Sequence, residues 1–165
     1  MNRADLVPFT LKVNGVKQLD LALGLMGKTV KDLSPVWADV DTYLRGAVGE
    51  QFGTTGRRGG SEWVKLSPKY KAWKDWHYPG RPILVRTGDL KQSLVEFGGN
   101  HIFRAERTSM TFGSRIPYAG YHQSGTRTMP SRPPIQTIQK KDSQAVVKIM
   151  QAYIAKVWKI HQRNI

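Results

Sequence analysis

The residue types that could carry acid–base or metal chemistry are few in this chain, and they are scattered. The four histidines lie in four different predicted elements, and none belongs to an HExxH or HxH metal-binding pattern. They are His77, His101, His122 and His161. Asp39 and Asp41 are two positions apart on a predicted helix, so they point in different directions and cannot share a proton there. We therefore expect no metal, no cofactor and no enzymatic activity.

His122 has the most polar surroundings of the four histidines. Tyr121 and Gln123 flank it, and this favours either a general base in a polar pocket or a partly buried ring that orders a turn by hydrogen bonds. The second interpretation is the preferred one, because Ser124-Gly125 lacks the GxSxG elbow of a hydrolase. An enzyme centred on His122, such as a nuclease or a wall hydrolase, is kept as the third hypothesis.

A glycine-rich segment, TTGRRGG at residues 54–60, has the composition of a mobile loop. Such loops can cradle phosphate, but the Walker pattern ends in Gly-Lys-Ser/Thr and GGSE does not supply it. We predict a flexible basic loop over residues 54–62.

Aromatic residues interleaved with lysines follow this loop. Stacking of exposed bases on such aromatics is one interpretation. Helical spacing favours the other, in which Tyr70 and Trp73 are core residues and Trp63 packs nearby. Trp76 falls off this stripe, so we expect it to be exposed and to contact another subunit.

Length, composition and charge narrow the protein class further. The 165 residues suit a single domain spanning 1–165, and cysteine is absent, which suits a reducing compartment. The first 13 residues contain no apolar run of signal-peptide length, and no stretch approaches the length of a membrane span. The net charge is +14: residues 57–91 hold nine Lys or Arg against three Asp or Glu, and residues 100–141 hold seven against one. An acidic partner, either nucleic acid or a protein surface, is therefore plausible.

Helices are expected in several places. Residues 16–26 could form a short helix, and Ser34-Pro35 begins a long one near 34–53, with serine as N-cap and proline at the first position. Its apolar stripe is Trp37, Val40, Leu44, Val48 and Phe52. Ser67-Pro68 repeats the same start. Thr87 could cap a third helix that directs Leu90 and Leu94 into the core. A last helix near 143–162 carries a stripe of Val146, Met150, Tyr153, Val157 and His161.

The remaining segments suggest a small sheet. Alternation through Phe9, Leu11 and Val13 predicts a strand, and a meander is expected at 95–97, 101–105 and 110–112. Prolines in MPSRPPI make 126–136 an extended Pro/Arg arm. The predicted class is α+β, a small antiparallel sheet flanked by helices.

Three segments carry a resemblance to a known family. The first two comprise Trp63, Leu66-Ser67-Pro68, Tyr70, Trp73-Lys74, Leu84, Arg86-Thr87-Gly88, Leu90 and Ser93. The third comprises Tyr118-Ala119, Tyr121-His122-Gln123, Gly125 and Pro130-Ser131-Arg132-Pro133-Pro134. In this order, they resemble the virion morphogenesis (tail completion) proteins of Mu-type and related tailed bacteriophages.

The resemblance implies a structural virion protein made in the host cytoplasm and built in at the head–tail junction or tail end. It implies a ring of copies, six in number, that joins other neck, connector or tail proteins. No catalytic residue, cofactor, small-molecule substrate or membrane is part of that expectation.

Candidate contact residues follow from these arguments. The expected interface residues are Trp76, Tyr121, His122, Arg127, Arg132 and Pro133. The expected contacts to genomic DNA or an acidic partner are Arg57, Arg58, Arg127 and Arg132. The alternative function is a basic, non-catalytic nucleic-acid-binding module.

Overall fold

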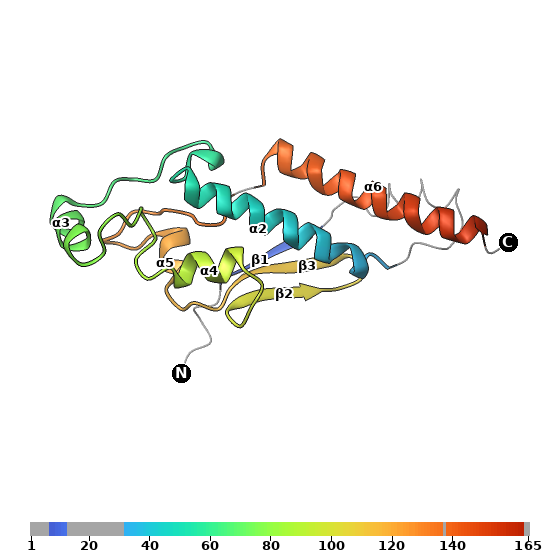
Figure 1. The fold of residues 1–165 in the computed structure, drawn as a ribbon, viewed down its shortest axis with the longest axis horizontal. Helices are drawn as coiled ribbons and strands as arrows, with labels where there is room; N and C mark the ends of the chain where they lie inside the picture. Colours follow the sequence, from blue (N-terminus) through green and yellow to red (C-terminus); the bar gives the residue numbers. More distant parts are fainter. Residues whose placement is uncertain (1–6, 13–31, 137, 164–165) are drawn as a thin grey trace. The chain divides into compact units, whose positions relative to one another are not determined.

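A computed structural model describes residues 7–12, 32–136 and 138–163 of the chain (Figure 1). Its elements, in chain order, are β1 (Val7–Lys12), the 3-10 helix η1 (Ser34–Val36), α2 (Trp37–Gly53), the 3-10 helix η2 (Arg57–Gly59), α3 (Pro68–His77), α4 (Asp89–Val95), β2 (His101–Ala105), β3 (Ser109–Ser114), α5 (Ala119–Ser124) and α6 (Lys140–Arg163). The strands pair in the order β1-β3-β2, and β2 and β3 are antiparallel. The predicted α+β class is confirmed. The short helix expected at 16–26 lies outside the described residues.

The chain divides into two compact units. The first comprises Met1–Phe9, Leu44–Ile102 and Gly113–Thr137, and the second comprises Thr10–Tyr43, Phe103–Phe112 and Ile138–Ile165. The boundary between them falls within α2 and within the strands. The expectation of a single domain over 1–165 stays a prediction.

The second unit is organised by the start of α2 and by α6. Trp37 is fully buried, and its Nε1 donates to the carbonyl of Glu106 at 2.7 Å. The hydroxyl of Tyr43 donates to Asp142 Oδ1 at 2.8 Å, while Asp142 Oδ2 accepts from the Gln139 N–H at 3.0 Å. Asp142 therefore holds the first turn of α6, as an acidic side chain at a helix start should.

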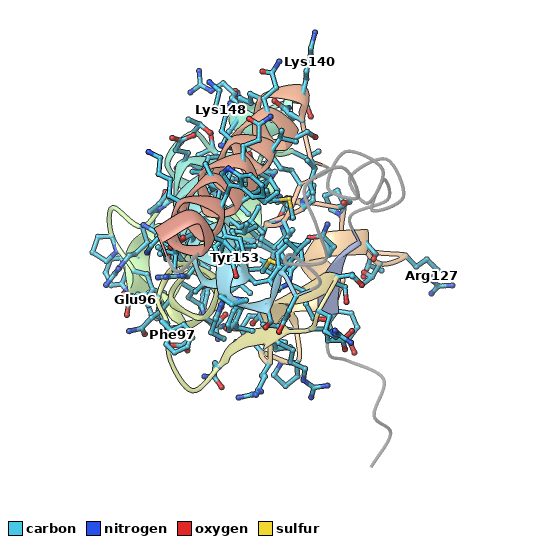
Figure 2. The ribbon with its side chains drawn as sticks, turned by 90° about the vertical axis from the view of Figure 1, so that its right-hand side faces the viewer. Glu96, Phe97, Arg127, Lys140, Lys148 and Tyr153 are labelled. Carbon is cyan, nitrogen blue, oxygen red and sulfur yellow. The ribbon has the colours of Figure 1, made fainter. Side chains whose placement is uncertain are left out.

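The helix α6 begins at Lys140, slightly before the expected start near 143, and has two different sides. Val146 and Met150 are buried, as their stripe predicts, and Tyr153 is half-buried. Lys140 and Lys148 project outward from the helix (Figure 2). The side chain of His161, the last residue of the predicted stripe, lies outside the described side chains. The amphipathic pattern is confirmed as far as Met150.

The first unit has its core between α2 and α4. Phe52 and Leu94 are almost fully buried, and the ring of Trp63 meets that of Phe52 edge to face at 5.4 Å between centroids. A hydrogen bond of 2.7 Å between the hydroxyls of Ser93 and Ser114 joins α4 to the end of β3. Each of these buried hydroxyls thus has the hydrogen-bond partner that a polar group in an apolar core requires. All five residues of the predicted α2 stripe are buried.

The two ends of α4 differ from expectation. Gly88, at φ 112°, is the N-cap residue, and the hydroxyl of Thr87 donates to the Asp89 carboxylate instead of capping the helix. At the other end, the Glu96 N–H donates to the carbonyl of Gln92 at 2.9 Å, so helical hydrogen bonding continues where a strand was predicted at 95–97. The predicted cap is wrong because the Thr87 hydroxyl is bonded to the Asp89 side chain, and the predicted strand is wrong because the Glu96 N–H completes a helical turn.

The glycine-rich segment is closed by hydrogen bonds and is not an open arm. Gly59 N–H donates to Gln51 Oε1 at 2.9 Å, and Trp63 N–H donates to the Thr55 carbonyl at 2.7 Å. Gly56 makes the turn possible, because its φ of 97° lies in the left-handed region. A Cβ there would approach Trp63 Cδ1 to 2.6 Å.

Replacing Gly56 should therefore be costly. We expect Gly56→Ala to lower the free energy of unfolding by about 1–3 kcal/mol, through backbone strain and the clash with Trp63. Gly53→Ala is the matched control, since a Cβ at Gly53 meets nothing within 4 Å. That helical substitution should leave stability unchanged or raise it by up to about 1 kcal/mol. Urea unfolding followed by circular dichroism measures both, and equal effects would contradict the turn geometry.

Candidate docking site

The helix α3 begins as its sequence predicts. Ser67 is the N-cap, its hydroxyl accepts from the Tyr70 N–H at 3.4 Å, and Pro68 occupies the first position. The helix ends at His77, and the Tyr78 N–H closes the last turn on the Lys74 carbonyl at 2.7 Å. The local signal at Ser67-Pro68 therefore placed the start of this helix.

The side of α3 that faces inward is not the predicted one. Tyr70 and Trp73, expected in the core, are each 41% exposed. Their rings stack along the surface with centroids 5.5 Å apart, and Trp73 stacks on His77 at 4.7 Å. The buried residue of the helix is Lys74. The core assignment of Tyr70 and Trp73 is wrong, because the loop opposite presents carbonyl groups that only a donor can satisfy.

Lys74 supplies that donor. It is 3% exposed, and its ammonium donates to the carbonyls of Arg81 and Pro82, the latter at 2.7 Å. Burial lowers the pKa of Lys74 below its usual range. The ammonium thus ties α3 to the loop that leads into α4. Sequence reasoning missed this residue, since a lysine between aromatic residues usually marks an exposed face.

Arg132 makes a second internal tie. Its Nε donates to the Val64 carbonyl at 2.6 Å and its Nη2 donates to the Lys65 carbonyl at 3.0 Å. Its backbone N–H donates to the His122 carbonyl at 2.8 Å. The side chain is buried, with 5% of the residue exposed, although the sequence placed it on an extended arm.

The rest of the Pro/Arg segment is packed in the same way. It contains neither helix nor strand, as its prolines require, but Pro134 and Ile135 are buried. Gln123 bonds both backbone groups of Ile135, and Trp63 Nε1 donates to the Pro133 carbonyl at 3.2 Å. The segment 126–136 is free of helix and strand, as an extended arm should be, but it packs against the chain beyond the turn of Thr126–Met129.

The hydrogen bonds of Lys74 and Arg132 hold together the walls of a cavity of about 470 Å³, which we call the α3–α5 cavity. Its wall comes from three stretches of the first unit: 66–74, 84–90 and 118–132. Each of them overlaps one of the three segments that carry the family resemblance, and Ser67, Arg86 and His122 are among the wall residues. Sequence motifs that lie up to 66 positions apart thus converge on one site.

His122 is half-buried in this wall. The ring of Tyr118 meets its ring edge to face at 6.0 Å between centroids. Burial, and then the positive charge of Arg132, lower the pKa of His122 below its usual range. Its Nδ1 has no hydrogen-bond partner among the described residues. No carboxylate in that part of the chain therefore orients the ring through Nδ1, as a catalytic triad requires.

The other candidate residues divide into exposed and internal ones. Trp76 is 84% exposed and Tyr121 is 51% exposed. Arg127 projects from the tip of its turn (Figure 2), and Arg57 is also exposed. Arg58 was expected at the surface, but only 5% of its side chain is accessible. Its Nε donates to the Glu50 carboxylate at 2.7 Å. Of the four arginines considered for DNA, Arg57 and Arg127 present their charge on the surface.

The described residues contain no group of three or more His, Cys, Asp or Glu that could hold a metal ion. Within the same ranges, no helix is long and apolar enough to cross a membrane. What the α3–α5 cavity offers is shape, positive charge and aromatic surface.

Removing the Arg132 tie should weaken the first unit. We expect Arg132→Ala to lower the free energy of unfolding by about 1–3 kcal/mol, because two charge-assisted hydrogen bonds are lost. Arg127→Ala is the control, an exposed arginine five residues away that should change stability by less than about 0.5 kcal/mol. Thermal and urea unfolding measure both variants, and a neutral Arg132→Ala would contradict the proposed tie.

The lowered pKa of His122 predicts a pH dependence. The unfolded chain binds a proton at His122 near pH 6.5, while the folded chain resists protonation until a lower pH, so stability should fall as pH drops below about 6.5. His122→Gln should remove part of that loss, and the exposed His77→Gln should not. Urea midpoints measured between about pH 7 and pH 5 test this. Parallel slopes for the wild type and both variants would contradict it.

Comparison with known protein families gives a match over most of the chain. The family model described as "Phage virion morphogenesis family" matches residues 15–155, which is most of the chain. No curated protein and no solved structure matches it. The matched range includes α2 to α5, all three cavity stretches and most of α6. The chain therefore belongs to the phage virion morphogenesis family.

Proposed function

We propose that this protein acts in head–tail joining or tail completion, as a ring at the neck or tail end of the virion. Family membership makes it a virion-associated structural or assembly protein. The finer role is supported by the convergence of the family-like segments on one cavity beside exposed aromatic residues. Such a surface binds other proteins by burying area, and it needs no catalytic group.

The proposed partners follow from the same surface. Copies of the chain form the ring, for which we propose six subunits, and other neck, connector or tail proteins bind above and below it. Trp76 and Tyr121 are both exposed, and tryptophan and tyrosine are among the residue types most enriched in interface hot spots. Neighbours in a closed ring use two different surfaces of each copy, so the contact is head to tail.

A second candidate function is a basic, non-catalytic nucleic-acid-binding module. The exposed Arg57 and Arg127 favour it, together with the outward lysines of α6, Lys140 and Lys148. Arg58 and Arg132 no longer contribute to this argument, because both side chains are bound within the chain. Binding of the isolated monomer to duplex DNA that weakens steeply with salt would favour this function.

Virion assembly without the protein tests the leading proposal. In a phage lacking this gene product, we expect filled heads beside unattached tails by negative-stain microscopy, because the joining surface is missing. A plasmid copy of the chain should restore joined particles, and a plasmid without it is the control. Normal infectious particles in the absence of the chain would contradict the proposed role.

A further inference from the structure

The α3–α5 cavity is an open site of a size that suits a large side chain. Its volume of about 470 Å³ lies within the range of roughly 300–1,000 Å³ typical of binding pockets. Leu66, Leu84 and Met129 supply apolar wall, and Tyr70 and Tyr118 supply aromatic wall. A pocket of this composition gains free energy by enclosing an apolar or aromatic group.

The charge of the wall narrows the choice of occupant. The cavity is lined by three cationic residues, Lys74, Arg86 and Arg132, and by one carboxylate residue, Asp89. Lys74 and Arg132 bond to backbone carbonyls, and within the described ranges no ion pair joins any of the three cations to a carboxylate. A wall with excess positive charge favours a carboxylate and the electron-rich face of an aromatic ring.

Trp76 and its neighbour Asp75 provide both groups on the same molecule. Trp76 is 84% exposed, and tryptophan is both the best aromatic partner for cations and the residue type most enriched in interface hot spots. The Asp75 side chain is 51% exposed and pairs with Lys71, four positions earlier. Exposed pairs of this kind contribute little stability, so the carboxylate can exchange this lysine for another cation at small cost.

Helix geometry places the two surfaces on different sides of α3. Tyr70 and Lys74 are four positions apart, lie on one face and line the cavity. Trp76 comes two positions after Lys74, about 200° around the helix, and does not line the cavity. Trp76 therefore cannot fill the cavity of its own chain, and any contact between the two must join different copies.

We propose that Trp76 of one copy docks into the α3–α5 cavity of the next, with Asp75 beside the cationic wall. The contact uses a different surface on each copy, so it is heterologous and can repeat from copy to copy around a ring. The inference rests on the proposed ring, because it names the contact that would hold neighbouring copies together.

Self-association of the full chain tests the contact. The wild-type chain should form oligomers larger than a dimer in sedimentation velocity. Trp76→Ala should weaken association about 30-fold or more, as expected for the loss of a tryptophan hot spot. Phe97→Ala is the matched control, since Phe97 is a 70% exposed aromatic that lies outside the cavity wall, and it should associate like the wild type.

A mixing experiment tests the head-to-tail geometry. Met129→Trp should fill the cavity while leaving Trp76 available, and the exposed Arg86→Glu is a second cavity variant that reverses one wall charge. Trp76→Ala and either cavity variant should each be monomeric alone at the concentration where the wild type associates. A one-to-one mixture of the two kinds should form a dimer and no larger species. The cavity variant supplies an intact Trp76, and the Trp76→Ala variant supplies an intact cavity.

Several results would overturn this contact. They are a wild-type chain that stays monomeric at its highest soluble concentration, a Trp76→Ala variant that associates normally, equal weakening by Phe97→Ala, and a mixture without dimers. Circular dichroism confirms that each variant is folded. If Trp76→Ala associates normally while the wild-type chain is still needed for joined virions, the contact is wrong and the assembly role stands. If association behaves as expected but virions form without the chain, the assembly role fails instead.

Discussion

The buried guanidinium of Arg132 is the interaction on which the site depends. The guanidinium donates to the carbonyls of Val64 and Lys65, and the backbone N–H of Arg132 donates to the His122 carbonyl. The stretch that contains His122 and Arg132 is thus joined to residues 64–65, which are distant in the sequence. Arginine suits this role because its planar fork reaches separate acceptors at once, whereas a lysine ammonium is a single point charge. The cavity exists because this tie and the Lys74 tie hold its walls in place.

The same two ties leave positive charge in a partly enclosed space. Backbone carbonyls offset the cost of removing the Lys74 ammonium and the Arg132 guanidinium from water, but carbonyl dipoles do not neutralise their charge. The wall also contains His122, whose pKa is lowered by burial and then by the charge of Arg132. The contact that we propose places an electron-rich group of another copy against this wall.

Local signals predicted the elements well and their orientation less well. The α2 stripe is buried throughout, and Ser67-Pro68 starts α3 as expected. Periodicity shows which residues share a face, but it does not show which face turns inward. In α3 the inward face carries Lys74, because the carbonyls of Arg81 and Pro82 lie opposite it. Tyr70 and Trp73 are then left at the surface, contrary to their apolar character.

The sequence by itself determined the α+β class, the end of α2, the start of α3, the β2–β3 pair and membership of a virion family, whereas Leu33 and not Ser34 is the N-cap of η1. These depend on caps, turns, periodicities and motifs that act over a few residues. Tertiary structure alone decided that Arg58 and Arg132 are internal, that the Pro/Arg segment packs against Trp63, and that three motifs enclose one cavity. The physical reason is that the acceptors of Arg132 lie 67 and 68 positions away, where no local pattern reveals them.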